Sequence, residues 1–144
     1  MQDANSGGHK MQKPAANADP DSADQIIHQL KAGLPVASFD DLRKYLDLSD
    51  NSLAQIVQIP KRTLSRRRMK GRFNTNESER VLRLTQVYEM AADVFESSEK
   101  ARRWLKNPAR GLGGRIPLEY ADTYIGANEV IKLLGRIDHG IFPG

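Results

Sequence analysis

The sequence predicts an all-α protein, in which a bundle of short helices is followed by a small helical domain at the C-terminal end. Apolar residues recur at helical spacing in several stretches between residues 38 and 137. Turn and cap residues separate these stretches, as expected of short helices joined by tight connections. With 144 residues, the chain has the length of one domain, or of two very small domains that share a core.

The composition excludes several kinds of chemistry. No cysteine is present, which removes disulfides, thiol catalysis and thiolate metal sites and suits a reducing compartment. No apolar stretch approaches the roughly 20 residues of a membrane span, and the N-terminus lacks the pattern of a signal peptide. We therefore expect a cytoplasmic protein without a membrane partner.

The first 24 residues contain no Val, Ile, Leu or aromatic residue. Such a segment buries too little apolar surface to offset its ordering entropy, so we expect a disordered arm over residues 1–24. Ile26, Ile27 and Leu30 predict a short helical extension over residues 24–31. The arm is either a tail without function or, through Lys10 and Lys13, a contact to DNA or to a partner.

A first helix of the bundle is predicted to run to about residue 46. Ser38 or Asp40 would accept from its first backbone amides. Its inward face is expected to consist of Leu42, Tyr45 and Leu46.

A second helix would start at Asp50 or Asn51, which are strong cap residues. Ala54 lies where two helices must approach closely, and Pro60 suits the first turn of a following helix. The inward residues of this second helix are expected to be Leu53, Ile56 and Val57.

A third helix over residues 61–70, closed by Gly71, carries most of the functional signal. Only Leu64 is a clear inward residue. Seven of the 22 basic residues fall between residues 61 and 72, where no acid occurs. Because such a run repels itself, it favours a counter-surface outside the protein, such as nucleic acid. A solvated helix face is the plainer alternative, and RNA is another, although stacking aromatics are lacking here.

The positions of Ala54, Val57, Ile59 and Leu64 resemble a helix-turn-helix of the Xre and Cro type. Gln58 departs from the glycine common in that turn, and Gln at positive φ carries a cost. In a major groove, Lys61, Arg62, Ser65 and Arg66 would meet base edges, and later cations would meet phosphates. The full set of DNA-binding candidates is Lys61, Arg62, Thr63, Ser65, Arg66, Arg67, Arg68, Lys70 and Arg72.

A long helix is predicted to follow, opened by a capping box over residues 76–79 and running to about residue 96. Leu82 and Met90 widen its apolar stripe beyond what one neighbouring helix would cover. This excess indicates either a bridge to the C-terminal part or a dimer surface. Residues 25–97 are thus assigned to DNA binding and dimerisation.

Residues 98–144 are assigned to the C-terminal domain. Ser97 or Ser98 would cap a helix over residues 99–106, in which Trp104 and Leu105 point into a core. The glycines at 111–114 lack the preceding strand and the spacing of a phosphate-binding loop. A last helix is predicted over residues 127–137, and His139-Gly140 would close it.

The C-terminal third contains, in order, Trp104-Leu105, Asn107-Pro108, Leu112-Gly113-Gly114, Pro117-Leu118, Thr123, Gly126, Val130, Leu133-Leu134, Arg136-Ile137 and His139-Gly140-Ile141-Phe142. In the joint order of these motifs it resembles the toxin-binding domain of the Xre/MbcA/ParS antitoxins. The resemblance implies an antitoxin that dimerises, inhibits a RES-domain toxin that destroys NAD, and represses its own operon. It also implies that Leu112, Gly114, Pro117 and Gly126 shape the domain and that its C-terminus contacts the toxin. The candidates for toxin contact are Arg136, His139, Gly140, Ile141 and Phe142.

An enzyme is not expected, because His9, His28 and His139 are far apart and no nucleophilic, paired-acid or metal-ligand pattern occurs. No catalytic residue, metal or cofactor is therefore assigned. The alternatives to an antitoxin are a stand-alone dimeric helix-turn-helix regulator and a nucleoid or partition accessory protein without operator preference.

Overall fold

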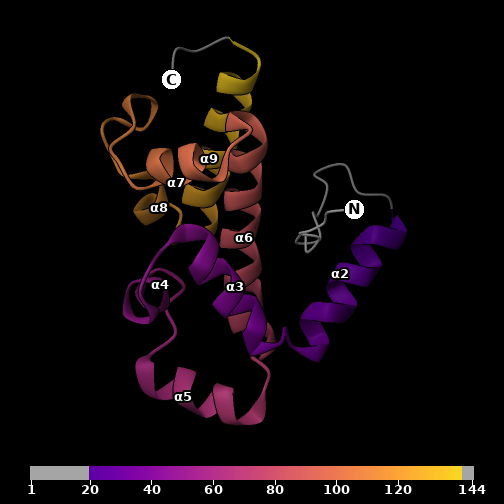
Figure 1. Cartoon of the computed structure of the whole chain (residues 1–144). Coiled ribbons are helices and arrows are strands. Elements are labelled where there is room, and N and C mark those ends of the chain that lie inside the picture. The colour runs from indigo at the N-terminus through magenta and orange to yellow at the C-terminus, as the bar shows by residue number, and fades with distance from the viewer. Residues whose placement is uncertain (1–19, 141–144) are drawn as a thin grey trace, which may run out of the picture.

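The structure, a computed structural model, describes residues 20–140 and, of the side chains, those from residue 22 onward. Every regular element in this part of the chain is helical, and two isolated β-bridges are the only extended pairings there (Figure 1). The all-α prediction is confirmed. The elements are α2 (Pro20–Ala32), α3 (Val36–Leu46), α4 (Asp50–Ile56), α5 (Lys61–Lys70), α6 (Thr75–Phe95), α7 (Ser98–Leu105), the 3-10 turn η1 (Arg110–Leu112), α8 (Pro117–Tyr120) and α9 (Tyr124–Asp138).

The long helix α6 is the centre of the molecule. It packs against α7 and α9, which follow it in the sequence, and against α2 and α3, which precede it (Figure 1). Buried residues from α3 through α9 belong to one continuous hydrophobic cluster. The two predicted domains therefore share a core, with α6 as the common element. Of the two residues that widen the apolar stripe, Met90 packs against this cluster and Leu82 is half-buried.

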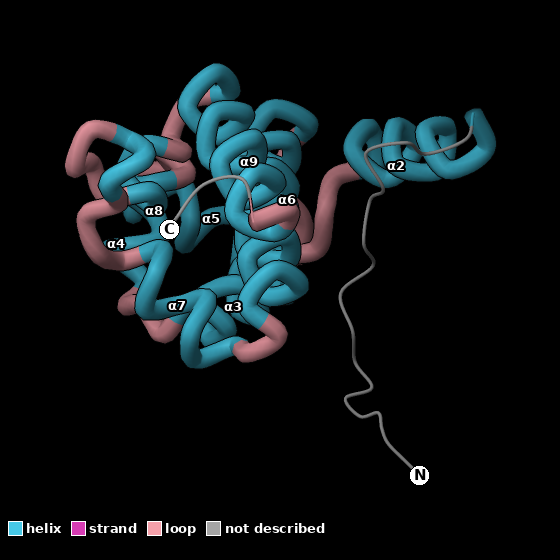
Figure 2. The backbone as a smooth tube through the Cα atoms, turned by 90° about the horizontal axis from the view of Figure 1, so that it is seen from above, coloured by secondary structure: helices cyan, strands magenta, loops and turns pink. Residues whose placement is uncertain are grey.

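The helix α2 stands to one side of the other helices (Figure 2). It starts at Pro20, earlier than the predicted extension at residue 24, so residues 20–24 do not belong to a disordered arm. The rest of the predicted arm, residues 1–19, lies outside the described residues. None of the helices in the described part of the chain is both long and apolar enough to cross a membrane.

The start of α3 differs from the prediction. Ser38 and Asp40 lie inside the helix, whose N-cap is Pro35 without a side-chain cap. The amide of Val36 instead donates to the carbonyl of Gly71 at 2.9 Å, so a segment distant in sequence fixes the helix start. As a result Phe39, which was not predicted as a core residue, is fully buried. The next helix starts as expected at Asp50, capped by the hydroxyl of Ser49.

The capping box of α6 lies two residues earlier than predicted. The side chain of Asn74 accepts from the amide of Glu77 at 2.8 Å, and the Glu77 carboxylate accepts from the amide of Asn74 at 3.0 Å. Asn76 is inside the helix. The preceding residue, Phe73, is buried, and its amide donates to the carbonyl of Leu34 at 2.9 Å. This tertiary pairing sets where α6 begins.

The C-terminal helices follow the predicted order with one shifted start. Ser97 caps α7, as predicted. The last helix, α9, starts at Tyr124 instead of residue 127, because the hydroxyl of Thr123 accepts from the amide of Gly126 at 3.0 Å. A Cβ atom at Gly126 would collide with the carbonyl of Tyr120, so α8 and α9 pack at a distance that only glycine permits.

Asn74→Ala is expected to lower the free energy of unfolding by about 1 kcal/mol, because it removes the N-cap of the central helix. The matched control is Asn76→Ala, at the position that the sequence pattern indicated; it should leave stability unchanged or raise it slightly, since Ala is the better helix former. Urea unfolding of both variants measures the difference. Equal losses would contradict the capping box seen here.

Candidate nucleic-acid interface

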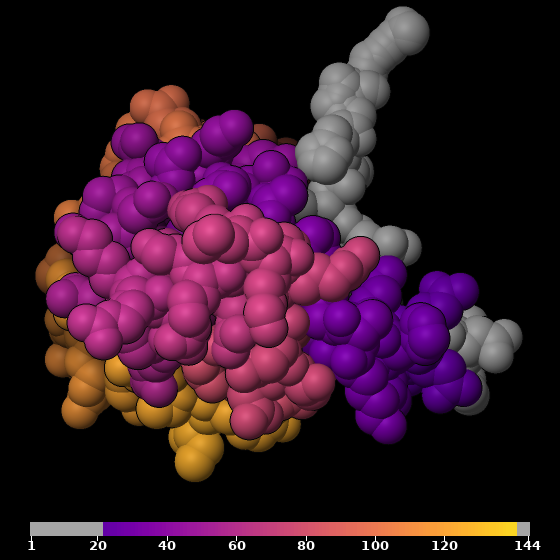
Figure 3. Space-filling view, turned by 90° about the horizontal axis from the view of Figure 1, so that it is seen from below, coloured from indigo at the N-terminus to yellow at the C-terminus, as the bar shows by residue number. Residues whose placement is uncertain are grey.

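The helix α5 lies at one end of the molecule and is seen face-on from below (Figure 3). It has the predicted bounds, with Gly71 at φ 92° as its left-handed C-cap. Leu64 is its only fully buried residue, at 5% exposure. A helix held by so little apolar contact leaves most of its circumference available to another molecule.

The turn before α5 has the geometry expected of a helix-turn-helix. Gln58 has φ 58°, as expected for the position where glycine is common. Val57 and Ile59 on either side are each only 2% exposed and anchor the turn in the core. The amide of Ile59 donates to the carbonyl of Ala54 at 2.9 Å, which ties the turn to α4.

Sequence reasoning missed one residue that holds this turn. Arg80 of α6 donates through Nε to the carbonyl of Val57 at 2.7 Å and through a terminal nitrogen to the carbonyl of Gln58 at 3.3 Å. These carbonyls follow the end of α4, where backbone acceptors lack helical partners. Arg80 is 23 positions from Val57 and 22 positions from Gln58, so no local sequence pattern links it to the turn.

Four cations of α5 are exposed and make no ion pair with the described residues: Lys61, Arg62, Arg66 and Lys70. At 100° per residue, Arg62 and Arg66 lie on the side of the helix opposite Leu64, with the exposed Ser65 beside them. Thr63 is half-buried at the edge of this face. Three of the predicted base-reading residues, Arg62, Ser65 and Arg66, therefore share one exposed surface, whereas the exposed Lys61 lies nearer the side of Leu64.

Met69 is a second residue that sequence reasoning missed. It is 90% exposed and lies two turns after Arg62, so both residues occupy the middle of the face opposite Leu64. Met69 follows Arg62 by seven residues, and this spacing could have placed the two side chains on the same face of the helix. An apolar side chain in that place could contact thymine methyl groups in a major groove.

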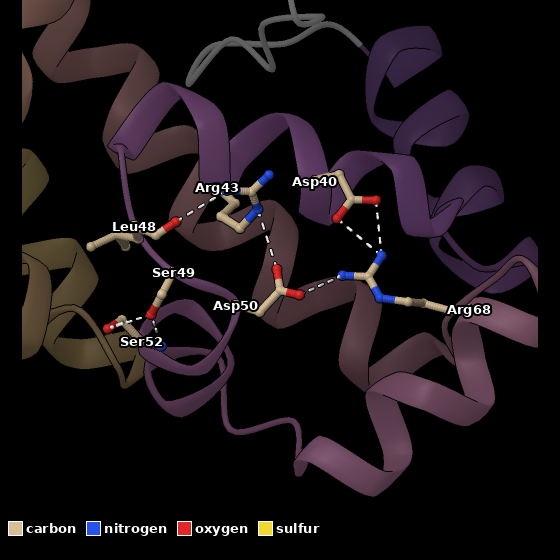
Figure 4. Close-up of polar contacts among 7 residues, drawn as sticks. All are labelled: Asp40, Arg43, Leu48, Ser49, Asp50, Ser52 and Arg68. Carbon is tan, nitrogen blue, oxygen red and sulfur yellow. Dashed lines mark hydrogen bonds and ion pairs between the residues drawn. The ribbon is translucent and has the colours of Figure 1, made fainter.

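Arg68 is not the free cation that the sequence suggested. Its guanidinium donates to both carboxylate oxygens of Asp40 at 3.0 Å and to Asp50 at 3.2 Å (Figure 4). It also lies 5.8 Å from the ring centre of Phe39. Asp50 in turn pairs with Arg43 at 3.2 Å. The resulting chain of ion pairs joins α3, α4 and α5.

Arg67 and Arg72 also have partners within the protein. The Arg67 guanidinium makes two bonds to the buried Glu77 carboxylate, at 2.8 and 3.1 Å. Arg72 donates to the carbonyl of Gly33. The inference that no acid compensates the basic run was therefore wrong for Arg67 and Arg68, because folding brings acids from other segments to them.

The pKa of Glu77 is lowered even though the carboxyl is buried. Burial raises the pKa, but the hydrogen bonds from Arg67 and from the amide of Asn74 outweigh it, together with the charges of Arg67 and Arg80. The ionised carboxylate is thus the form that the fold stabilises.

The C-terminal candidates lie far from α5, at the other end of α6 and α9 (Figure 1). Arg136 is exposed on the last turns of α9. His139 is exposed and its Nδ1 lies 2.7 Å from the carbonyl of Gly135, while Gly140 has φ 70°. The other two candidates, Ile141 and Phe142, lie outside the described residues.

The residues expected to shape the C-terminal domain are mostly internal. Leu112, Pro117 and Gly126 are buried. Gly114 is exposed and has φ 85°, a left-handed conformation that favours glycine. Each of the four therefore has a structural reason for its residue type or position.

Comparison with known proteins matches two parts of the chain to family domains. Residues 25–85 match the antitoxin Xre-like helix-turn-helix domain, and residues 90–140 match the antitoxin Xre/MbcA/ParS C-terminal toxin-binding domain. The antitoxin Xre of Yersinia enterocolitica is 36% identical over 119 residues, which cover 81% of this chain and 80% of that protein. The chain belongs to the Xre antitoxin family.

Two further relatives of this Xre-family chain differ in how much of it they match. The antitoxin Xre of Photorhabdus laumondii is 40% identical over 114 residues, covering 78% of this chain and 77% of that protein. A more distant match, named Prs ADP-ribosylating antitoxin, comes from a Sphingobium strain and is 33% identical over 79 residues, about half of each protein (49% and 50%). Each of these relatives is named as an antitoxin.

We expect Glu77 to make stability depend on acid pH. Because its pKa is lowered on folding from an ordinary value of 4.5, the unfolded chain takes up the proton first as the pH falls. The stabilisation is complete above about pH 4.5 and is lost as the pH falls through the lower, folded pKa. Chemical unfolding between pH 3 and 7, roughly the range in which carboxylates titrate, should show this loss in the wild type.

Glu77→Gln should be less stable at neutral pH and should lose less stability in acid. Glu79→Gln is the matched control, because Glu79 is an exposed carboxylate on the same helix without an ion pair in the described part of the chain; it should keep the wild-type pH profile. Identical profiles for the wild type and Glu77→Gln would contradict the role of this carboxylate.

Proposed function

We propose that this protein is the antitoxin of a type II toxin-antitoxin pair, which inhibits a RES-domain, NAD-degrading toxin and represses its own operon as a homodimer in the cytoplasm. One observation supports it above others: a single shared core carries an exposed cationic face on α5 and, at the opposite end, the C-terminal segment of a toxin-binding domain. Two separate partners can thus be bound without competing for one surface.

On operator DNA, α5 would enter the major groove with the face opposite Leu64. Arg62 and Arg66 would read guanine through two-pronged hydrogen bonds, and Lys61 and Ser65 would reach neighbouring bases. Lys70 would contact phosphate. Arg67, Arg68 and Arg72 would support the helix, since their guanidinium groups already bind acids or a carbonyl of the protein.

On the toxin, the contact would be made by the residues that follow the last turn of α9. Arg136, His139 and Gly140 lie at the exposed end of this helix, and Ile141 and Phe142 would extend from it to the active-site cleft of the toxin.

Co-expression with the neighbouring gene tests the proposal. A stable complex, restored growth and a restored NAD level are expected. A stand-alone dimeric regulator would show no association and no rescue, while still binding a specific DNA sequence. A nucleoid or partition accessory protein would bind DNA without sequence preference, which the same binding assay detects.

Arg62→Ala or Arg66→Ala should weaken operator binding by about 1–3 kcal/mol and relax the preference for the contacted base pair. Lys70→Ala should weaken binding to operator and random duplexes alike and reduce its salt dependence. Titration of each variant with both duplexes at two salt concentrations separates the roles. Equal losses on both duplexes for all three variants would refute the assignment of base-reading residues.

Truncation after Ile137 should abolish toxin inhibition and leave operator binding intact. Of the removed residues, those from Asp138 to Gly140 lie at the end of the molecule opposite α5, and of the helix α9 only Asp138 is lost. Growth rescue and DNA titration of the truncated chain measure the two activities. Loss of both activities together would show that the C-terminal residues belong to the shared fold.

A further inference from the structure

We propose that Arg80 and Gln58 are positioning residues for DNA recognition, and that the loop between α8 and α9 of the toxin-binding domain is part of the same device. Together they hold the turn before α5 and thereby fix where the base-reading end of that helix points. This inference rests on the proposed binding of DNA by α5. It concerns residues that do not themselves read bases.

The two halves of α5 are attached to the body in different ways. The C-terminal half is held by side chains: Arg67 by Glu77 of α6, and Arg68 by Asp40 and Asp50. The N-terminal half, which carries Lys61 and Arg62, has no such ion pair with the described residues. Its direction therefore depends on the turn over residues 57–60.

The turn is held at a conformation that its own sequence disfavours. Gln58 has φ 58°, and a residue with a Cβ atom adopts this left-handed region at a cost. The carbonyls of Val57 and Gln58 would lack partners at the end of α4 without the guanidinium of Arg80, which accounts for both. Charged donors make the stronger hydrogen bonds to such carbonyls.

The side chain of Gln58 links the turn to the C-terminal domain. Its Nε2 donates to the backbone carbonyl of Asp122 at 3.2 Å, across 64 positions of sequence. Asp122 directly precedes Thr123, the N-cap of α9. The toxin-binding domain thus contacts the DNA-binding turn itself, in addition to sharing α6 with it.

Binding of the full chain to two duplexes tests the role of Arg80. The probes are the tightest duplex selected from a randomised pool and a shuffled duplex of the same composition. Arg80→Met should weaken binding to the selected duplex by about tenfold or more, since loss of a charge-assisted hydrogen bond is of that order, and should change binding to the shuffled duplex by less than about twofold. Arg80→Lys keeps the charge and one hydrogen bond, and should recover part of the discrimination.

Arg83→Met is the matched control. Arg83 is one turn away on α6 and makes no hydrogen bond or ion pair in the described part of the chain, so its loss should leave the ratio between the two duplexes unchanged. A proportional loss on both duplexes for Arg80→Met, restored by Lys, would instead mean direct phosphate contact and overturn the proposal. An unchanged ratio would overturn it too. If Arg80→Met does not fold, Arg80→Lys alone decides, because it must still reduce the ratio.

Gln58→Gly tests the contribution of the α8–α9 loop. Glycine relieves the left-handed conformation, so the melting temperature should rise or stay the same, while the bond to Asp122 is lost. A lower ratio between the two duplexes at unchanged stability supports the link; an unchanged ratio removes the loop from the device. If the wild type itself prefers no selected duplex, the proposed function fails, which is distinct from failure of this inference.

Discussion

The arrangement of α5 against the start of α6 depends on the hydrogen bonds and the ion pair of the Glu77 carboxylate. This carboxylate closes the capping box of α6 and also binds the guanidinium of Arg67 from α5. One buried charge therefore stabilises the first turn of the central helix and holds α5 against it. Because the carboxylate is 6% exposed and both of its roles need the ionised form, the burial is compensated only while both partners are present.

From this joint, α6 carries the structure to the other end of the molecule. Its stripe of buried residues belongs to the shared core, and the helix packs against α2, α3, α7 and α9. The two family domains share this helix and one core, so no flexible linker separates them. A partner that changes the packing of α9 can therefore change the free energy with which the helix-turn-helix binds its own ligand. By linkage, that ligand must then change the binding free energy of the partner by the same amount.

Local features of this fold could be predicted from the sequence, and features set by tertiary contacts could not. The bounds of α5 follow from Pro60 and Gly71, and the positive φ of Gln58 follows from the family pattern of the turn. The cap of α6 was misplaced because a tertiary bond between Phe73 and Leu34 sets where the helix begins. Neither residue reveals this pairing in its own neighbourhood of the sequence.

The ion pairs of the basic run, residues 61–72, could not be predicted from the sequence either. Periodicity separated the inward Leu64 from the outward cations, but it could not tell which arginines would find acids. The partners of Arg68 come from positions 28 and 18 residues away, and that of Arg67 from 10 residues away. Counting charge within a window therefore overstates the field available to a polyanion, because paired arginines add little net potential.

The ion pairs separate the cations of α5 into those that hold the helix against the protein and those that stay available to another molecule. Arg67 and Arg68 use the planar fork of the guanidinium to hold carboxylates, which fixes the helix against the body. The cations on α5 without an ion pair in the described part of the chain keep their donors for another molecule, and two of them, Arg62 and Arg66, lie on the face opposite Leu64. Self-repulsion on that face persists until counterions or a polyanion neutralise it, whereas the paired side is already neutral. The same helix can therefore be stable in the free protein and still attract DNA, because its structural charges and its binding charges are different residues.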